Sequence, residues 1–343
     1  MIQRLLQEEI RRILPPAQVR FDEPMRRHCS FRTGGPADAL VYVRTGAELA
    51  ALLSLLHREG EDYFVLGRGT NLLIGDGGYR GVIITAAHPV GMAGTDESVG
   101  INGLVGMNRA TGMDGTDRNA ENSGVFSLEE IRVQEEYGIR AGAGATLHAV
   151  AMTAMEHGLS GLEFAAGIPG TVGGGLVMNA GAYGGEMKQV VSSVCGMMPD
   201  GEIRTWTGKE MEFSYRFSIL HRMPAIALMA DFSLHPDDPE RIRARMADLA
   251  AQRRAKQPLE YPSAGSTFKR PKGLFAGKLI MDAGLRGMRV GDAQVSEKHC
   301  GFVINRGGAT SAQIRELIDR VQEMVYEDAG VRLEREVIYL GEF

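Results

Sequence analysis

Residues 161–183, GLEFAAGIPGTVGGGLVMNAGAY, are the part of this sequence that most restricts its fold. After Phe164 the stretch is mostly glycine, alanine and proline, whose side chains cannot act as acids, bases or metal ligands. Backbone without side chains can approach an anion closely, and concave groups of N–H donors bind phosphate. A second glycine-rich segment, GRGTN at 67–71, follows a predicted strand. Two such segments predict a ligand with a long diphosphate, and a dinucleotide fits this description.

Neither segment carries one of the two common phosphate-binding motifs. The sequence has no G-x-x-x-x-G-K-[ST], and Gly67 and Gly69 are followed by Leu72 where a Rossmann motif needs its third glycine. For either segment taken alone, a glycine loop that only forms a turn remains the alternative.

Hydrophobic periodicity and breakers predict an alternation of helices and strands. Expected helices are 1–14, 45–60, 147–157, 240–256 and 312–329, and expected strands are 38–44, 63–67, 81–85, 190–198, 202–206, 226–234 and 332–340. Residues 88–124 interrupt this alternation with scattered glycines and no period. We expect a mobile surface excursion there, with an insertion, a lid and a disordered loop left open.

Composition excludes several functional classes. A net charge of −5 without a basic run argues against nucleic-acid binding. No stretch is apolar enough to span a membrane, and the N-terminus lacks the features of a signal peptide. Cys29, Cys195 and Cys300 lie far apart, which favours a reducing, cytoplasmic setting without disulfides. The eight histidines show no ligand spacing, so no metal is expected.

Several ordered blocks together resemble the UDP-N-acetylenolpyruvoylglucosamine reductases, flavoenzymes of peptidoglycan precursor synthesis. The blocks are FRTGGPAD (31–38), GRGTNLLIGDGGYRGVII (67–84), AGAG (141–144), the stretch 161–186, YRFS (215–218), QPLEYPSAGSTFKRP (257–271), residues 276–305 and LEREVIYLG (333–341). The distance between Phe217 and Gly265 favours the shorter, second structural type of this family.

The resemblance implies an α+β chain: a two-lobed FAD-binding fold of the vanillyl-alcohol-oxidase/PCMH type, then a smaller α/β substrate domain. The FAD-binding domain would cover 1–235, with lobes at about 18–87 and 125–235 and a glycine-rich insertion at 88–124, and the substrate domain 236–343. Residues implied to bind FAD are Gly67, Arg68, Gly69, Thr70, Asn71, Leu72, Ala166, Gly167, Ile168, Pro169, Gly170, Gly173, Gly174, Asn179, Gly181 and Ala182.

The family reaction implies three catalytic residues. NADPH reduces FAD, the reduced flavin passes hydride to the terminal enol carbon of UDP-N-acetylglucosamine enolpyruvate, and the adjacent carbon, which bears the carboxylate, is protonated, giving UDP-N-acetylmuramate. Arg216 would bind the carboxylate, Ser266 would donate the proton, and Glu336 would polarise the enol. Alternation along a strand does not separate Glu336 from Glu334, but the family glutamate directly precedes the valine.

Other roles stay open at this stage. Tyr215 contacts substrate or only packs, and candidates for the UDP group are Lys269, Arg270, Lys278, Gln294 and Lys298. One rival function is a non-covalent FAD oxidase of the same fold acting on an alcohol or sugar, although the sequence around GRGTN lacks a flavin-linking His or Cys. Another is a catalytically silent nucleotide-binding module. The sequence does not distinguish NADPH from NADH as the reductant. It does not indicate the oligomeric state.

Overall fold

The computed structural model describes residues 4–88 and 126–343. The excursion predicted at 88–124 therefore lies, apart from His88, outside the described residues, and its role stays a prediction.

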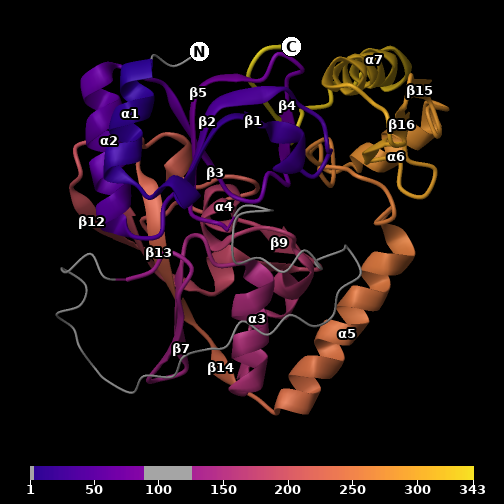
Figure 1. The fold of residues 1–343 in the computed structure, drawn as a ribbon. Helices are drawn as coiled ribbons and strands as arrows, with labels where there is room; N and C mark the ends of the chain where they lie inside the picture. Colours follow the sequence, from indigo (N-terminus) through magenta and orange to yellow (C-terminus); the bar gives the residue numbers. More distant parts are fainter. Residues whose placement is uncertain (1–3, 89–125) are drawn as a thin grey trace. The chain divides into compact units, whose positions relative to one another are not determined.

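Five of the helices in the described residues were expected from the sequence, and two were not. They are α1 (Arg4–Ile13), α2 (Gly46–Glu59), α3 (Leu147–Glu156), α4 (Val172–Met178), α5 (Pro239–Lys256), α6 (Ala276–Asp282) and α7 (Ser311–Ala329) (Figure 1). The ends of α2 show why these predictions hold: Thr45 Oγ1 accepts the Glu48 N–H at 3.2 Å, and Gly60 ends the helix at φ +66°. The unexpected α4 contains three consecutive glycines.

Each of the seven predicted strands overlaps a strand of the structure, but the described residues also form strands that the sequence did not predict. The strands are β1 (Val19–Pro24), β2 (Pro36–Tyr42), β3 (Tyr63–Leu66), β4 (Leu72–Ile74), β5 (Tyr79–Thr85), β6 (Ile131–Gln134), β7 (Gly138–Gly142), β8 (Leu159–Ser160), β9 (Gly181–Ala182), β10 (Gly185–Glu186), β11 (Val191–Met197), β12 (Ile203–Thr207), β13 (Ile226–Ser233), β14 (His235–Pro236), β15 (Arg289–Val290), β16 (Ala293–Val295), β17 (Val303–Asn305) and β18 (Ile338–Leu340).

The closing strand expected at 332–340 was wrong in its first half, since only β18 forms. The N–H groups of Glu336 and Val337 both point to the carbonyl oxygen of Thr267, at 2.9 and 3.5 Å. A regular ladder alternates its hydrogen bonds along the strand, so the chain bends here instead of continuing the pairing.

The chain separates into two compact units, each assembled from distant segments. Unit 1 comprises Met1–Arg20, Ala39–Arg68 and Gly81–Ala251, and unit 2 comprises Phe21–Asp38, Gly69–Arg80 and Gln252–Phe343. The domain boundary predicted between 235 and 236 stays a prediction, because compactness alone does not say where a family domain begins.

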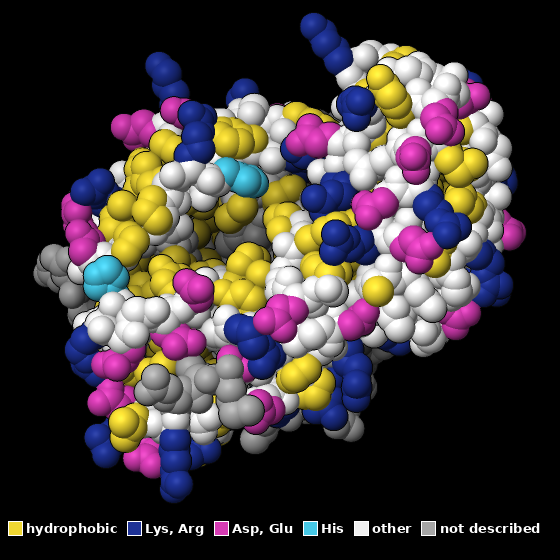
Figure 2. All heavy atoms as spheres, turned by 90° about the horizontal axis from the view of Figure 1, so that it is seen from above, with side chains coloured by type: hydrophobic (Ala, Val, Ile, Leu, Met, Phe, Trp, Pro, Cys, Tyr) yellow, Lys and Arg dark blue, Asp and Glu magenta, His cyan; other side chains and the backbone are white. Residues whose placement is uncertain are grey.

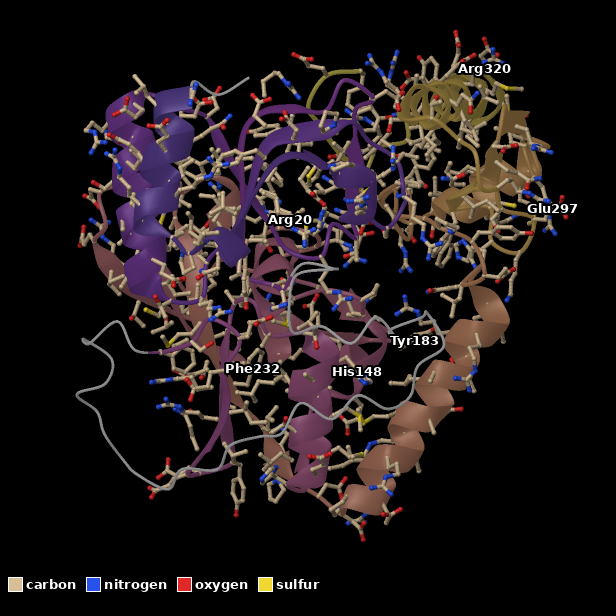
Figure 3. The ribbon with its side chains drawn as sticks, in the orientation of Figure 1. Arg20, His148, Tyr183, Phe232, Glu297 and Arg320 are labelled. Carbon is tan, nitrogen blue, oxygen red and sulfur yellow. The ribbon has the colours of Figure 1, made fainter. Side chains whose placement is uncertain are left out.

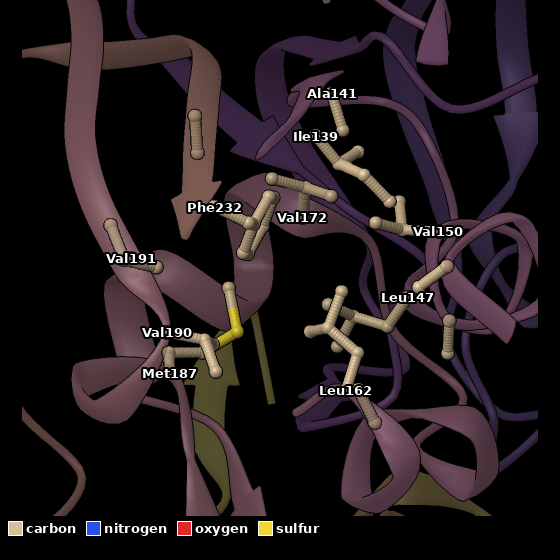
Figure 4. Packing of buried hydrophobic residues seen from close by; sticks show 14 of the residues in the cluster. Ile139, Ala141, Leu147, Val150, Leu162, Val172, Met187, Val190, Val191 and Phe232 are labelled. Atoms are coloured by element: carbon tan, nitrogen blue, oxygen red, sulfur yellow. The ribbon is translucent and has the colours of Figure 1, made fainter. Parts of the chain in front are cut away.

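Unit 1 is built around a five-stranded antiparallel sheet of order β12-β11-β13-β7-β6. In its centre Val194 of β11 pairs with Trp206 of β12 and Ala230 of β13. Apolar side chains of this sheet pack with those of α3 and α4 in one core, of which Figure 4 shows Ile139, Leu147, Val150, Leu162, Val172, Met187 and Phe232. This core fixes the position of α4 and of the loop before it. Strands β3 and β5 form a parallel pair outside this sheet, with Tyr63 opposite Val82.

Unit 2 contains the small antiparallel sheet β15-β16-β17 and the parallel pair β4 and β18, in which Leu73 is opposite Tyr339. Helix α7 begins at a capping box formed by Thr310 and Gln313. Asp76 accepts the N–H groups of Ser311 and Ala312, both at 2.9 Å, so the loop after β4 holds the start of α7.

The surface agrees with the composition. Acidic and basic side chains are interspersed over the face in view in Figure 2. Within residues 4–88 and 126–343, every helix is too short or too polar to cross a bilayer.

Candidate functional site

The two glycine-rich segments meet in unit 1 at Gly67 and Thr171. A Cβ atom on Gly67 would lie 2.8 Å from Thr171 Oγ1, so only glycine allows this approach. Thr171 is buried and caps α4 by accepting the Gly174 N–H at 3.2 Å. The sequence predicted two cooperating segments, and the structure brings them into contact; Thr171, however, was missed. Its position before a glycine run was the available signal.

Most of the first segment belongs to unit 2. Gly69, at φ +61°, packs so closely on the backbone of His28 that a Cβ would lie 2.1 Å from its carbonyl oxygen. The sequence analysis did not predict that His28 and Cys29 lie beside this loop, because about forty residues separate them from it in the chain. Both side chains are buried and bonded within the protein: His28 Nε2 lies 2.8 Å from Glu23 Oε1, and Cys29 Sγ donates to the Thr33 carbonyl at 3.0 Å.

Backbone N–H groups of the second segment are largely used within the protein. Those of Ile168, Gly170 and Gly173 donate to carbonyl oxygens at 2.8 to 3.0 Å, and that of Gly174 donates to Thr171. The glycines of this segment therefore contribute close approach rather than a ring of free donors.

Gly170 and Gly174 are two positions in this segment where the fold alone does not require glycine. A Cβ on Gly170 would have its nearest neighbour, Leu147 Cδ1, at 3.6 Å, and one on Gly174 would have Thr171 Oγ1 at 3.5 Å. Both are ordinary van der Waals distances, and neither residue has a positive φ. Space that a side chain could fill is thus left open beside exposed backbone, as a flat ligand such as a flavin needs.

The remaining predicted cofactor residues lie along the same two segments. Arg68, Gly167 and Pro169 are exposed, Thr70 is half-buried, Leu72 begins β4, Ala166 is half-buried, and Gly181 and Ala182 form β9. His148 of α3, which the sequence analysis missed, has Nδ1 2.8 Å from the Ala166 carbonyl oxygen and so holds the loop from the side (Figure 3).

Arg216 lies in a two-residue turn of unit 1. Ser214 and Phe217 exchange two backbone hydrogen bonds, of 3.0 and 3.1 Å, and Arg216 between them has φ +55°. Its guanidinium carbon lies 5.2 Å from the centroid of the exposed Tyr215 ring. A guanidinium stays charged at any working pH and can bind a carboxylate with two hydrogen bonds.

Ser266 and Glu336 lie close together in unit 2. Ser266 follows Gly265, whose φ is +74°, and precedes the buried Thr267, which accepts the Glu336 N–H at 2.9 Å. Among the described residues, the half-buried Ser266 hydroxyl has no hydrogen-bond partner. It is therefore available to a ligand.

Burial separates the two glutamates that periodicity could not. The Glu334 side chain is 71 % exposed and forms an ion pair with Lys269, whereas Glu336 is half-buried and its Oε2 atom is fully buried. A carboxylate held in this way is restricted in orientation, as a group acting on one substrate atom requires.

The candidates for the UDP group all have interactions within unit 2. Besides the Lys269–Glu334 pair, Lys278 lies 2.7 Å from Asp282, Lys298 Nζ donates to the Arg254 carbonyl at 2.7 Å, and the Arg270 guanidinium stacks on Phe275. Gln294 is buried and binds Gly287 and Arg306. Exposed ion pairs are weak, so the lysines remain able to exchange partners.

Tyr183 is a further residue that the sequence analysis missed. It occupies the turn between β9 and β10 with Gly184, at φ +54° and +88°, and its side chain is exposed (Figure 3). A bulky side chain in the left-handed region is strained, and such strain concentrates at functional sites.

Comparison with known proteins assigns the family. A family model described as "UDP-N-acetylenolpyruvoylglucosamine reductase, C-terminal domain" matches residues 257–340, and one described as "FAD binding domain" matches residues 104–207. The UDP-N-acetylenolpyruvoylglucosamine reductase of Agathobacter rectalis is 48% identical over 96% of both chains, and that of Clostridioides difficile is 43% identical over 96% of both.

A solved structure agrees with these sequence matches. The crystal structure of UDP-N-acetylenolpyruvylglucosamine reductase (MurB) from Thermus caldophilus is similar with a TM-score of 0.68 at 30% identity, over 94% of this chain and 98% of that one. The predicted fold class, an α+β chain with an FAD-binding domain and a second, smaller domain, is confirmed. The chain belongs to the UDP-N-acetylenolpyruvoylglucosamine reductase family.

Proposed function

We propose that this chain catalyses the NADPH-dependent, FAD-mediated reduction of UDP-N-acetylglucosamine enolpyruvate to UDP-N-acetylmuramate. One observation carries the proposal beyond family membership. The hydroxyl of Ser266 is available, and its neighbour Thr267 holds the backbone of Glu336 at 2.9 Å. This backbone contact supports the assignment of Ser266 as the proton donor and of Glu336 as the orienting carboxylate.

The residues of unit 1 fit an FAD-binding role. The open space beside Gly170 and Gly174, and the contact of Gly67 with Thr171, give a smooth stretch of backbone that a flavin and its diphosphate can approach. When bound, FAD supplies the transfer of hydride from NADPH to the substrate. The glycine-rich segments contribute binding and orientation.

The chain's own side chains deal with charge and protons. Arg216 binds the substrate carboxylate, which draws electron density from the neighbouring double bond. Ser266 Oγ–H gives its proton to the carbon that bears this carboxylate, after hydride has reached the terminal carbon. Glu336 polarises the enol and orients the donor, and Lys269, Arg270, Lys278, Gln294 or Lys298 bind the UDP group.

The rival function, an oxidase using O₂ and an alcohol or sugar, is not favoured. His28 and Cys29, which lie beside the first glycine loop, are buried and bonded within the protein. A covalent flavin link through them would require this part of unit 2 to open.

Anaerobic spectroscopy tests the proposal. We expect the purified protein to be yellow, to bleach with NADPH, and to regain its colour when the enolpyruvyl sugar nucleotide is added under nitrogen. Recovery only on admission of O₂, together with oxidation of an alcohol or sugar, would instead support the oxidase. A nucleotide-sugar substrate also supports a cytoplasmic location, in line with Cys29, Cys195 and Cys300 being free thiols.

A further inference from the structure

Each glycine-rich segment contains an asparagine whose side chain donates a hydrogen bond to a backbone carbonyl. Asn179 directly follows α4 in the second segment, and Asn71 is the last residue of the first. Both were expected to bind FAD, and their side-chain contacts indicate a different task.

Asn179 connects the second segment to the turn that carries Arg216. It ends α4 at φ +42° and is 1% exposed. Its Nδ2 donates to the Ser214 carbonyl at 3.0 Å and to Glu186 Oε2 at 3.1 Å, and its Oδ1 accepts the Lys188 N–H at 2.9 Å. Both amide hydrogens and one acceptor position are therefore used within the protein.

The residue that follows the turn of Arg216 is also hydrogen-bonded to α4. Ser218, which is fully buried, donates its hydroxyl to the Val177 carbonyl at 3.0 Å. Two residues before and two residues after Arg216, the chain is thus bonded to residues 177–179. A shift of α4 moves both ends of the turn.

Asn71 has the corresponding contact in unit 2. Its Nδ2 donates to the Glu336 carbonyl at 3.0 Å, and its own carbonyl accepts the Ile338 N–H at 3.0 Å. The Glu336 backbone is therefore held on one side by Asn71 and on the other by Thr267, whose carbonyl accepts the Glu336 N–H. This contact forms where the chain leaves the regular pairing of β18.

We infer that Asn179 and Asn71 are positioning residues, which hold Arg216 and Glu336 in place from the two segments assigned to FAD. The inference rests on the proposed function, because it takes the roles of Arg216 and Glu336 from there. It links the two tasks physically: the backbone that binds the cofactor also fixes the residues that act on the substrate.

Double-mutant cycles in the FAD-loaded enzyme test this. Asn179→Gly removes the side chain yet keeps the left-handed backbone, and Asn71→Ala removes the amide. We expect FAD content and reduction by NADPH to be unchanged, while kcat/KM for the enolpyruvyl substrate falls roughly 10- to 100-fold, as for a misplaced catalytic group. The Kd of substrate for the oxidised protein, measured by calorimetry, should rise for Asn179→Gly.

Combining each asparagine variant with a variant of the residue that it positions separates a positioning effect from a general loss of stability. With Arg216→Gln present, adding Asn179→Gly should change kcat/KM by less than about twofold, and with Glu336→Gln present, adding Asn71→Ala should do the same. In the crossed combination of Asn179→Gly with Glu336→Gln, the fold-losses in kcat/KM of the two single variants should multiply. Thr45→Ala removes the cap of α2 and is the control for reduced stability without a kinetic effect.

Opposite outcomes have distinct meanings. Loss of FAD from Asn179→Gly or Asn71→Ala, or multiplicative effects in the matched pairs, would overturn the inference. If Asn179→Gly does not fold, Ser218→Ala tests the same turn from its exit. Wild-type protein that fails to reduce the substrate, or Arg216→Gln without effect, would refute the proposed function itself.

Discussion

The Glu336 N–H donates to the Thr267 carbonyl oxygen over 2.9 Å, which places the chain of Glu336 directly beside the chain that carries Ser266. Residues almost seventy positions apart in sequence are thereby held as neighbours within unit 2. This backbone contact is the structural basis for testing Ser266 and Glu336 together as the proposed proton donor and carboxylate.

Glu336→Gln and Glu334→Gln form a matched pair for this arrangement. We expect Glu336→Gln to lower kcat by roughly 10²-fold or more, because a positioned charge is lost from the reacting atoms. Glu334 is exposed and pairs with Lys269, so its variant should keep kcat and change only KM slightly. Steady-state kinetics of the two variants measure this difference. Equal losses of kcat would contradict the assignment of Glu336 rather than Glu334, which rests on burial.

Ser266→Ala should separate the two half-reactions. FAD and its reduction by NADPH stay normal, whereas reoxidation by the enolpyruvyl substrate slows by at least the ~10²- to 10⁴-fold typical of a lost general acid. Ser266→Cys should recover part of the rate, since a thiol also gives up a proton. Rapid-mixing absorbance at the flavin band follows each half. Slowed NADPH oxidation with normal substrate reduction would assign the serine to nicotinamide binding.

Gly170→Leu should give folded protein without flavin. The fold leaves room for a Cβ at this position, so the substitution blocks the ligand rather than the chain. Gly46→Leu is the control, because its Cβ also has ordinary neighbours, at 3.9 Å, and lies at the start of α2. Flavin absorbance per protein and circular dichroism are the measurements. Stoichiometric flavin in Gly170→Leu would count against the site.

Tyr183→Gly should raise the stability of the protein and lower its activity. A bulky residue held at positive φ costs about 1–3 kcal/mol, so glycine at this turn should raise the free energy of unfolding by about 1 kcal/mol. Turnover with the sugar nucleotide should fall, since the exposed ring is lost. Denaturant unfolding and kinetics are measured on the same preparation; a more stable variant with unchanged kinetics would mean that the strain serves no ligand.

His299 should make stability depend on pH. Burial lowers the pKa of His299 below its ordinary 6.5, because desolvation disfavours the charged ring, and its Nδ1 accepts the Gly301 N–H at 3.2 Å. The unfolded chain then binds more protons than the folded chain, so stability is full above about pH 6.5 and is lost as pH falls through the folded-state pKa. His299→Gln should flatten this slope in unfolding experiments, while His235→Gln, at an exposed histidine, serves as control.

Local signals predicted local structure well. Thr45 and Gly60 delimit α2 because caps and left-handed glycines act within a few residues. The glycine run was expected to bind a diphosphate through its backbone, which stays a prediction, and helix α4 was missed. Three glycines disfavour a helix, whereas the Thr171 cap and the packing of Val172 and Leu176 in the core of unit 1 stabilise it.

Contacts between distant segments explain the other differences. His28 and Cys29 lie beside Gly69, and Asn71 reaches the Glu336 carbonyl, through pairings that periodicity cannot express. The resemblance selected Glu336 over Glu334, whereas the reason in physical terms, the burial of one carboxylate oxygen, needed the folded chain.

The discontinuous make-up of unit 2 limits how this protein can be divided. The Asn305 amide donates to the Phe31 carbonyl at 2.9 Å, Ser311 and Ala312 depend on Asp76, and β18 pairs with β4. A fragment that begins after α5 would lack each of these partners, which come from residues 21–38 and 69–80. Residues 252–343 are therefore not expected to fold as an independent domain. Gene truncation or fusion near residue 257 should yield an unfolded polypeptide, whereas supplying the missing segments on a co-expressed fragment offers a route to complementation.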